Sequence, residues 1–291
     1  MKVAISAIGV CSPFGGGWEG FRQGVREKRK CFTEHEPFKH LPYTQAGISD
    51  KKAFRSFLKQ RKAAKLLTPA AKLGLLACGR TLAGQSIVPS EDVGLFVAVG
   101  REPPDEGEAE RTLVVSHQDG ALNSQKLSTI GRDLYPPLLP LKTLPNMILA
   151  HISIHLKLYG ENGVWAGGPS AGLQAFYSAY WALVEERCSA VLIGGADSFI
   201  DLGNARDIYR MGIDCQPGEA GIFFLLQPCG INPNPIAEVE WQGKSFASGT
   251  IREQIGYCGA AEGLLYLAAQ LATSYSFLWG GFQFHSKVVS S

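Results

Sequence analysis

The sequence contains no Cys-x-x-Cys pair, although it has seven cysteines, an odd number that cannot all pair with one another. This pattern fits neither a disulfide framework nor a structural zinc site. His151 and His155 have the spacing of two metal ligands on one helical face, but no carboxylate or cysteine completes a set. We therefore expect reduced thiols in a cytoplasmic protein that binds no metal and no cofactor.

Charge is also scarce, since 19% of the residues are charged and the formal net charge is +2. No low-complexity tract is present, which excludes extensive disorder. One basic segment stands out, between residues 51 and 72, and its default interpretation is a solvated helical face. Without interleaved aromatic residues or a base-reading motif, the sequence predicts no binding of nucleic acid. The basic residues of this segment are Lys51, Lys52, Arg55, Lys59, Arg61, Lys62, Lys65 and Lys72.

One long stretch has no charge at all, "GLLYLAAQLATSYSFLWGGFQF" at residues 263–284, and its length equals that of a membrane span. The polar residues inside it, among them Gln270, Ser274 and Gln283, would be costly in lipid. The segment is therefore interpreted as a buried helix, a turn and a strand, and no membrane span is expected.

Apolar runs of strand length alternate with longer helical patterns along most of the chain. Such alternation indicates an α/β fold with a largely parallel sheet that is covered on both faces. The segment between residues 100 and 142 is rich in Glu, Pro and Gly and is expected to be a loop. Helices are predicted at 17–30, 68–84, 143–160 and 170–188, and strands at 2–10, 92–100, 162–168, 189–198 and 218–228.

The stretch "GGPSAGLQA" contains a G-x-S-x-G pattern, which presents a nucleophilic serine in hydrolases. Asp197 or Asp201 and then His285 follow Ser170 in the order that an α/β-hydrolase triad requires. No H-G-G-G-like oxyanion loop precedes the serine. The alternative interpretation is that Ser170 is unreactive, begins the following helix and caps it through its hydroxyl.

Six further stretches carry a resemblance that covers nearly the whole chain. They are "VAISAIGVCSPFGGG", "LPNMILAHISIHLKLYGENG", "GENGVWAGGPSAG", "LIGGADS", "QPGEAGIFFLL" and "REQIGYCGAAEG", followed by the closing "SFLWGGFQFHSKVV". In this order they resemble the β-ketoacyl synthases. The resemblance implies a thiolase-like, layered αβαβα fold with a truncated second half. The two halves would be residues 1–228 and 229–291, packed as one unit.

The catalytic positions of that family hold other residues in this chain. The catalytic cysteine falls on Pro169, and the histidine of the I-G-H motif falls on Tyr257. The remaining histidine should lie between "FFLLQP" and the I-G motif, where no histidine occurs. Condensation requires a thiolate and imidazoles. The chain therefore resembles the chain-length factors, inactive subunits that pair with an active ketosynthase in type II polyketide and aryl polyene systems.

The resemblance also implies partners and a set of site residues. The partners would be an active ketosynthase, forming a heterodimer across the strand "GVWAG", and an acyl carrier protein, for which the basic segment is the candidate surface. The following helix, with Tyr177, Tyr180 and Trp181, is expected to give an aromatic association surface. A larger side chain at Ile148 is expected to shorten the product while leaving the complex intact. The residues expected at the tunnel or interface are Met147, Ile148, His151, Val164, Trp165 and Phe176.

Overall fold

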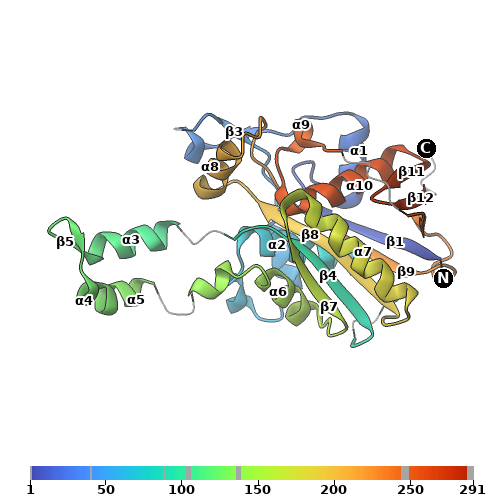
Figure 1. The fold of residues 1–291 in the computed structure, drawn as a ribbon, viewed down its shortest axis with the longest axis horizontal. Helices are drawn as coiled ribbons and strands as arrows, with labels where there is room; N and C mark the ends of the chain where they lie inside the picture. Colours follow the sequence, from blue (N-terminus) through green and yellow to red (C-terminus); the bar gives the residue numbers. More distant parts are fainter. Residues whose placement is uncertain are drawn as a thin grey trace.

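The computed structural model describes residues 2–39, 41–87, 90–102, 106–135, 139–243 and 249–286 (Figure 1). Its main element is an eight-stranded mixed sheet in the order β11-β12-β10-β1-β9-β8-β4-β7. β4 is parallel to both β7 and β8, and the other pairs are antiparallel. The strands are β1 (Val3–Cys11), β2 (Thr33–Glu34), β3 (Gln45–Ala46), β4 (Val93–Val99), β5 (His117–Gln118), β6 (Ala121–Leu122), β7 (Asn162–Ala166), β8 (Ala190–Ser198), β9 (Glu219–Pro228), β10 (Ala237–Trp241), β11 (Ser276–Trp279) and β12 (Phe282–Ser286).

Helices cover both faces of the sheet, as the two-sided apolar strands predict. α2 and α6 pack on one face, and α1, α7 and α10 pack on the other. The helices are α1 (Gly17–Arg26), α2 (Pro69–Leu82), α3 (Glu106–Ser116), α4 (Ser124–Lys126), α5 (Arg132–Leu134), α6 (Met147–Leu156), α7 (Ala171–Val184), α8 (Leu202–Arg210), α9 (Arg252–Ile255) and α10 (Glu262–Thr273). Shorter 3-10 or π segments are η1 (Glu36–Phe38), η2 (Lys52–Phe57), η3 (Arg61–Lys65), η4 (Leu127–Gly131), η5 (Leu139–Thr143), η6 (Gly168–Ser170) and η7 (Gly259–Ala261).

α2 lies directly on the backbone of the central strands. A Cβ atom at Gly9 would be 2.1 Å from the carbonyl oxygen of Ala77, and one at Gly221 would be 2.6 Å from that of Leu73. Any larger residue at these two positions would push the helix away from the sheet. Glycine in β1 and β9 therefore sets how closely α2 packs.

The uncharged stretch at 263–284 forms most of α10 and then a hairpin of β11 and β12. The predicted helix and turn are present, but two strands follow where one was expected. Among the described residues, no helix is both long and apolar enough to cross a membrane.

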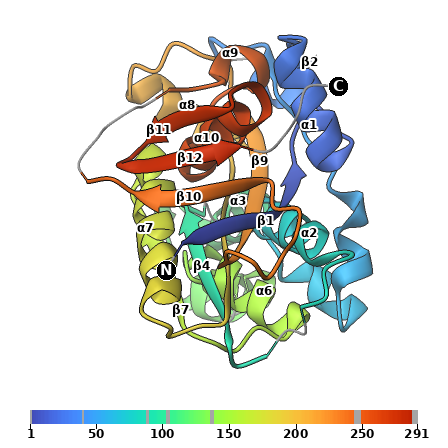
Figure 2. The same ribbon diagram turned by 90° about the vertical axis from the view of Figure 1, so that its right-hand side faces the viewer.

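The second half of the chain continues the sheet of the first half. Val3 of β1 is paired with Val239 of β10, so β10, β12 and β11 are hydrogen-bonded to the first half (Figure 2). In Figure 2 these three strands run across the view while β4 and β7 run steeply, which shows the strong twist of the sheet. Through this pairing of β1 with β10, the long strands of both halves join in one sheet in the described part of the chain.

Residues 106–135 form an arm that extends away from the body, at the left of Figure 1. It contains α3, the β5–β6 hairpin, α4, η4 and α5. The sequence-based expectation of a loop is therefore wrong for these residues. The helices of the arm lack a clear division into an apolar and a polar face. In α3, for example, the apolar residues Leu113 and Val114 are exposed to solvent.

Candidate functional site

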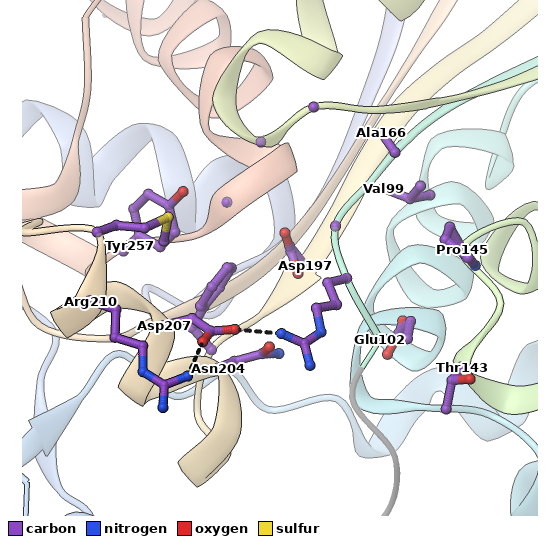
Figure 3. A pocket seen from close by; sticks show the side chains of 17 residues that line it. Val99, Glu102, Thr143, Pro145, Ala166, Asp197, Asn204, Asp207, Arg210 and Tyr257 are labelled. Carbon is purple, nitrogen blue, oxygen red and sulfur yellow. Dashed lines mark hydrogen bonds and ion pairs between the residues drawn. The ribbon is translucent and has the colours of Figure 1, made fainter. Parts of the chain in front are cut away.

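A cavity of about 550 Å³ opens at the carboxyl ends of β4, β7 and β8 (Figure 3). Ligands in α/β proteins bind preferentially at this edge of a parallel sheet, because the loops that follow the strands converge there. The lining includes backbone as well as side chains. It consists of Val99, Gly100, Arg101, Glu102, Thr143, Pro145, Ala166, Gly167, Gly168, Asp197, Phe199, Asn204, Asp207, Arg210, Met211, Tyr257 and Gly259.

The turn between β7 and α7 forms part of this wall. Gly168 has a φ of 59°, a left-handed conformation that favours glycine. Pro169 follows it and is exposed. Ser170 begins α7 as predicted, but the predicted cap is wrong, because no side-chain hydrogen bond caps the helix. Its hydroxyl instead donates to the carbonyl oxygen of Gly167 at 3.0 Å, which tightens the turn.

Tyr257 lies beside this turn, although 87 residues separate it from Ser170 in the sequence. A Cβ atom at Gly168 would be 4.0 Å from the hydroxyl oxygen of Tyr257. The ring makes an edge contact with Phe199 at 4.7 Å between centroids, and the Arg252 guanidinium lies 4.9 Å from the ring centroid. Burial raises the pKa of Tyr257 to about 12. The structure thus places Tyr257 beside Gly168, the residue before Pro169, and neither Pro169 nor Tyr257 offers a base at neutral pH.

Two buried carboxyl groups also face the cavity. Asp197 is the penultimate residue of β8, and its two oxygens accept hydrogen bonds from the backbone N–H groups of Ser198 and Ala260, each at 2.9 Å. Burial raises its pKa to about 7. Glu102 accepts a hydrogen bond from the Thr68 hydroxyl at 2.8 Å, and burial raises its pKa to about 8.

Glu102 was not recognised from the sequence, although a signal for it exists. It follows the buried strand β4, just as Asp197 lies near the end of the neighbouring parallel strand β8. Polar residues that follow neighbouring parallel strands meet at one edge of the sheet.

A second cavity of about 590 Å³ lies on the other side of the same turn. Pro169, Ser170, Leu173 and Trp279 are among its lining residues. Arg252 and Glu262 also line it and form a two-point ion pair, with nitrogen to oxygen distances of 2.7 and 2.6 Å. The turn at Gly168–Ser170 therefore separates two cavities.

The hydrolase triad is not assembled. Within the described ranges, no hydrogen bond links Ser170 to His285 or to either aspartate. Asp201 accepts from the backbone N–H of Asn204 and caps α8, and Asp197 is engaged by backbone N–H groups. His285 is exposed on β12, where it pairs with Glu238 and Ser276.

A fluorophosphonate probe should leave Ser170 unlabelled, because no base is in place to remove the proton of its hydroxyl. Intact-mass measurement after incubation with the probe checks this, with the Ser170→Ala variant as the control. A probe adduct that disappears in that variant would restore the hydrolase interpretation.

The three predicted tunnel residues of α6 occupy different environments. Met147 is half-buried, whereas Ile148 is 1% exposed. A Cβ atom at Gly74 would lie 3.2 Å from Cγ2 of Ile148, so the isoleucine packs tightly against α2. Tryptophan at this position would overpack the core, and the expectation that this variant leaves the complex intact stays a prediction. His151 is also buried, and its Nε2 has no hydrogen-bond partner in the described part of the chain.

The imidazole rings of His151 and His155 are stacked at 6.0 Å between centroids. Burial lowers the pKa of both side chains. In the ranges that the structure describes, no three His, Cys, Asp or Glu side chains gather as metal ligands.

The other three predicted residues lie on β7 and α7. Val164 and Trp165 are half-buried and point to opposite faces of the sheet, each against a different core cluster. Phe176 is fully buried, with its ring centroid 5.2 Å from that of Phe282 and 5.5 Å from that of Trp279. It is a core residue of this chain, because the β11–β12 hairpin covers its face of α7. None of the six predicted residues is among those that line the cavity at the carboxyl ends of β4, β7 and β8.

The aromatic surface expected on α7 is mostly internal as well. Tyr180 is buried and Trp181 is half-buried, and the ring of Tyr180 lies 5.0 Å from that of Phe282. Tyr177 remains 45% exposed. The strands of the second half cover this face, so the expected association surface is not there.

Comparison with known proteins relates these features to a family. Residues 1–223 match the β-ketoacyl synthase N-terminal domain. A search of curated proteins finds no match. The fold is similar to that of the ishigamide ketosynthase/chain length factor, with a TM-score of 0.67 and 19% identity, covering 94% of this chain and 91% of that chain. It is also similar to a type II polyketide synthase acyl-carrier protein in complex with its ketosynthase bound to the hexaketide, with a TM-score of 0.69 and 11% identity, covering 98% of this chain and 99% of that chain.

A third similar structure is the ketosynthase from module 6 of the bacillaene synthase of Bacillus subtilis 168, with a TM-score of 0.67 and 12% identity. The similarity covers 93% of this chain but 60% of that one, so this chain is short relative to that ketosynthase. Because the three similar structures share only 11–19% sequence identity with this chain, they support its fold and not its function. The match to residues 1–223 covers most of the sequence, and the chain belongs to the β-ketoacyl synthase family, with a thiolase-like fold and a truncated second half.

Proposed function

We propose that this chain is a non-catalytic subunit of the chain-length-factor type. It would pair with an active β-ketoacyl synthase and shape its acyl tunnel in polyketide, aryl polyene-like or fatty-acid-type biosynthesis. The observation that carries the proposal is that Pro169 stands in the turn before α7 and that Tyr257 lies beside Gly168 of the same turn. Proline offers neither a thiol to hold an acyl group nor an N–H for an oxyanion hole, and tyrosine replaces an imidazole.

The free edge of β7 supports a partner subunit. In the described part of the chain β7 pairs with β4 alone and ends the sheet, so one side of its backbone has no strand beside it. Such an edge is a template for pairing with another chain, and pairing across a two-fold axis would continue the sheet. This is the strand "GVWAG" for which the family resemblance implies pairing in a heterodimer.

The arm adds a second argument for a partner. Leu113, Val114 and Ile130 are 51%, 66% and 55% exposed on it. The extensive contacts of α3 are with η4, α4 and α5 of the same arm. Large apolar side chains gathered on a projecting element are unfavourable in water and are typical of association surfaces. The arm leaves the sheet after β4, the neighbour of the edge strand, so a partner at β7 lies close to its base.

An acyl carrier protein is the second partner in this proposal. The basic segment contains six exposed cations, and none of them forms a salt bridge among the described residues. It folds as the two short helices η2 and η3, not as the single helical face expected from the sequence. Unpaired cations on a rigid surface favour an acidic protein through electrostatic steering. These residues are Lys52, Arg55, Lys59, Arg61, Lys62 and Lys65.

A cytoplasmic location remains part of the proposal. It is supported by the seven cysteines, none of which forms a disulfide in the part of the chain that the structure describes.

Co-expression with an active ketosynthase, followed by purification through a tag on this chain, tests the function. We expect a complex of one copy of each, in which intact-mass analysis after incubation with acyl-loaded carrier protein finds the acyl group on the ketosynthase only. A charged residue on the free edge, Val164→Lys, should weaken the complex, whereas Lys62→Gln should not. Failure to co-purify, or a stoichiometric acyl adduct on this chain, would exclude the proposal.

A further inference from the structure

The mouth of the cavity at the carboxyl ends of β4, β7 and β8 contains two arginines that share one carboxylate. Arg101 donates to Asp207 at 2.8 Å, and Arg210 lies 3.6 Å from the other oxygen of the same group. The structure gives neither guanidinium another acidic partner among the described residues. Both side chains are more than 70% exposed, so their remaining N–H groups are available to a ligand. This cluster of three side chains has a net positive charge.

The interior of the cavity offers further hydrogen-bond donors. The hydroxyl of Tyr257 has no hydrogen-bond partner in the described part of the chain, and it lies next to Gly168 in the cavity wall. Glu102 lies across the cavity from Tyr257 and Arg210 (Figure 3). Because its raised pKa of about 8 keeps it mostly protonated at neutral pH, its carboxyl group can donate as well as accept.

The remaining carboxyl groups oppose an anion only in part near neutral pH. Asp207 is compensated by the arginines, and burial raises the pKa of Asp197 to about 7, so this group is partly protonated there. The volume of about 550 Å³ lies in the range of small-molecule sites. Guanidinium groups recognise carboxylate and phosphate oxygens through their fixed donor geometry.

We propose that this cavity binds a small anionic molecule. Its carboxylate or phosphate accepts hydrogen bonds from the remaining N–H groups of Arg101 and Arg210, and a carbonyl oxygen on it accepts a hydrogen bond from Tyr257. With Pro169 at the adjacent turn, the chain holds this molecule without forming a bond to it. The inference does not depend on the chain-length role, since the residues that carry it all belong to this chain.

Calorimetric titration of the isolated chain near neutral pH tests the proposal. The carboxylate probes are levulinate, which has one carboxylate and one ketone, its neutral methyl ester, and valerate, which lacks the ketone. Dihydroxyacetone phosphate and dihydroxyacetone form the corresponding phosphate pair. We expect at least one anion to bind about tenfold more tightly than its neutral counterpart. The pair that shows this difference identifies the anionic group.

Three variants locate the site. Arg101→Gln and Arg210→Gln should each weaken binding of the anion several-fold, whereas Lys62→Gln on the basic segment should not. If levulinate binds, Tyr257→Phe should weaken the binding of levulinate and leave the binding of valerate unchanged. Only levulinate has a ketone oxygen that can accept a hydrogen bond from the Tyr257 hydroxyl. Thermal melts confirm that the variants fold. Equal binding of anion and neutral counterpart, no binding by any probe, or unchanged affinity in both arginine variants would overturn the proposal and leave the chain-length proposal untouched.

Discussion

Phe282→Ala is expected to lower the free energy of unfolding by about 3–5 kcal/mol, the usual range for a large aromatic residue removed from a core. Phe282 lies on β12, is fully buried and belongs to the second half of the chain. Its ring lies 5.2 Å from that of Phe176 and 5.0 Å from that of Tyr180, both on α7 of the first half. The substitution therefore opens a cavity between the two halves.

Denaturant unfolding followed by circular dichroism and by tryptophan fluorescence measures this effect. Leu278→Ala, on the adjacent strand of the same hairpin, is the matched control, because Leu278 is 42% exposed. It should change the free energy of unfolding by less than about 1 kcal/mol. The control separates loss of core packing from any general weakening of the hairpin.

The same experiment examines the division into residues 1–228 and 229–291, which we retain as a proposal. If the halves form one unit, both probes should report a single transition in the wild-type protein and in the variant. Two separate transitions, or a loss in Phe282→Ala as small as that in Leu278→Ala, would show that the halves are independent.

Glu102→Gln should stabilise the protein increasingly as the pH rises. The pKa of Glu102 is about 8 in the folded chain, compared with 4.5 for the free side chain. Between these values the unfolded chain has lost the proton while the folded chain keeps it, so the stability of the wild-type protein falls with rising pH. Each pH unit in this window costs about 1.4 kcal/mol, which gives about 3–4 kcal/mol between pH 5 and pH 8.

Glutamine at this position keeps an oxygen that can accept a hydrogen bond from the Thr68 hydroxyl, and its side chain cannot ionise. The difference in unfolding free energy between Glu102→Gln and wild type, measured by urea denaturation at several pH values, should therefore grow from pH 5 to pH 8. Glu110→Gln, on the exposed face of α3, serves as the control and should show no such growth. A constant difference for Glu102→Gln across this range would show that the buried carboxyl ionises freely.

Much of the architecture follows from the sequence alone. The apolar runs at 92–100 and 189–198 predict the buried parallel strands β4 and β8, and each lies within two residues of its expected bounds. The order of the motifs identifies the family, and the match to residues 1–223 confirms it. The assignment of Pro169 and Tyr257 to its catalytic positions stays a prediction. The inferences about the fold succeed because strand alternation, helix termini and glycine turns depend on residues that are close in sequence.

The sequence was less informative about which surfaces are covered by residues that are far away in the chain. The pattern of α7 predicts an apolar face with Phe176, but the contact of that face with Phe282 depends on pairing between β1 and β10. In the same way, the arm at 106–135 lacks a strong periodic pattern and was expected to be a loop.

The sequence by itself therefore determined the family and the order of most elements. Only the tertiary structure decided that the aromatic face of α7 is internal and that Glu102 and Tyr257 share a cavity with Arg101 and Arg210. The physical reason is that local patterns specify which face of an element is apolar. Which element packs against that face depends on segments far away in the chain. The pKa of a carboxyl group such as Glu102 depends on burial by such segments as well.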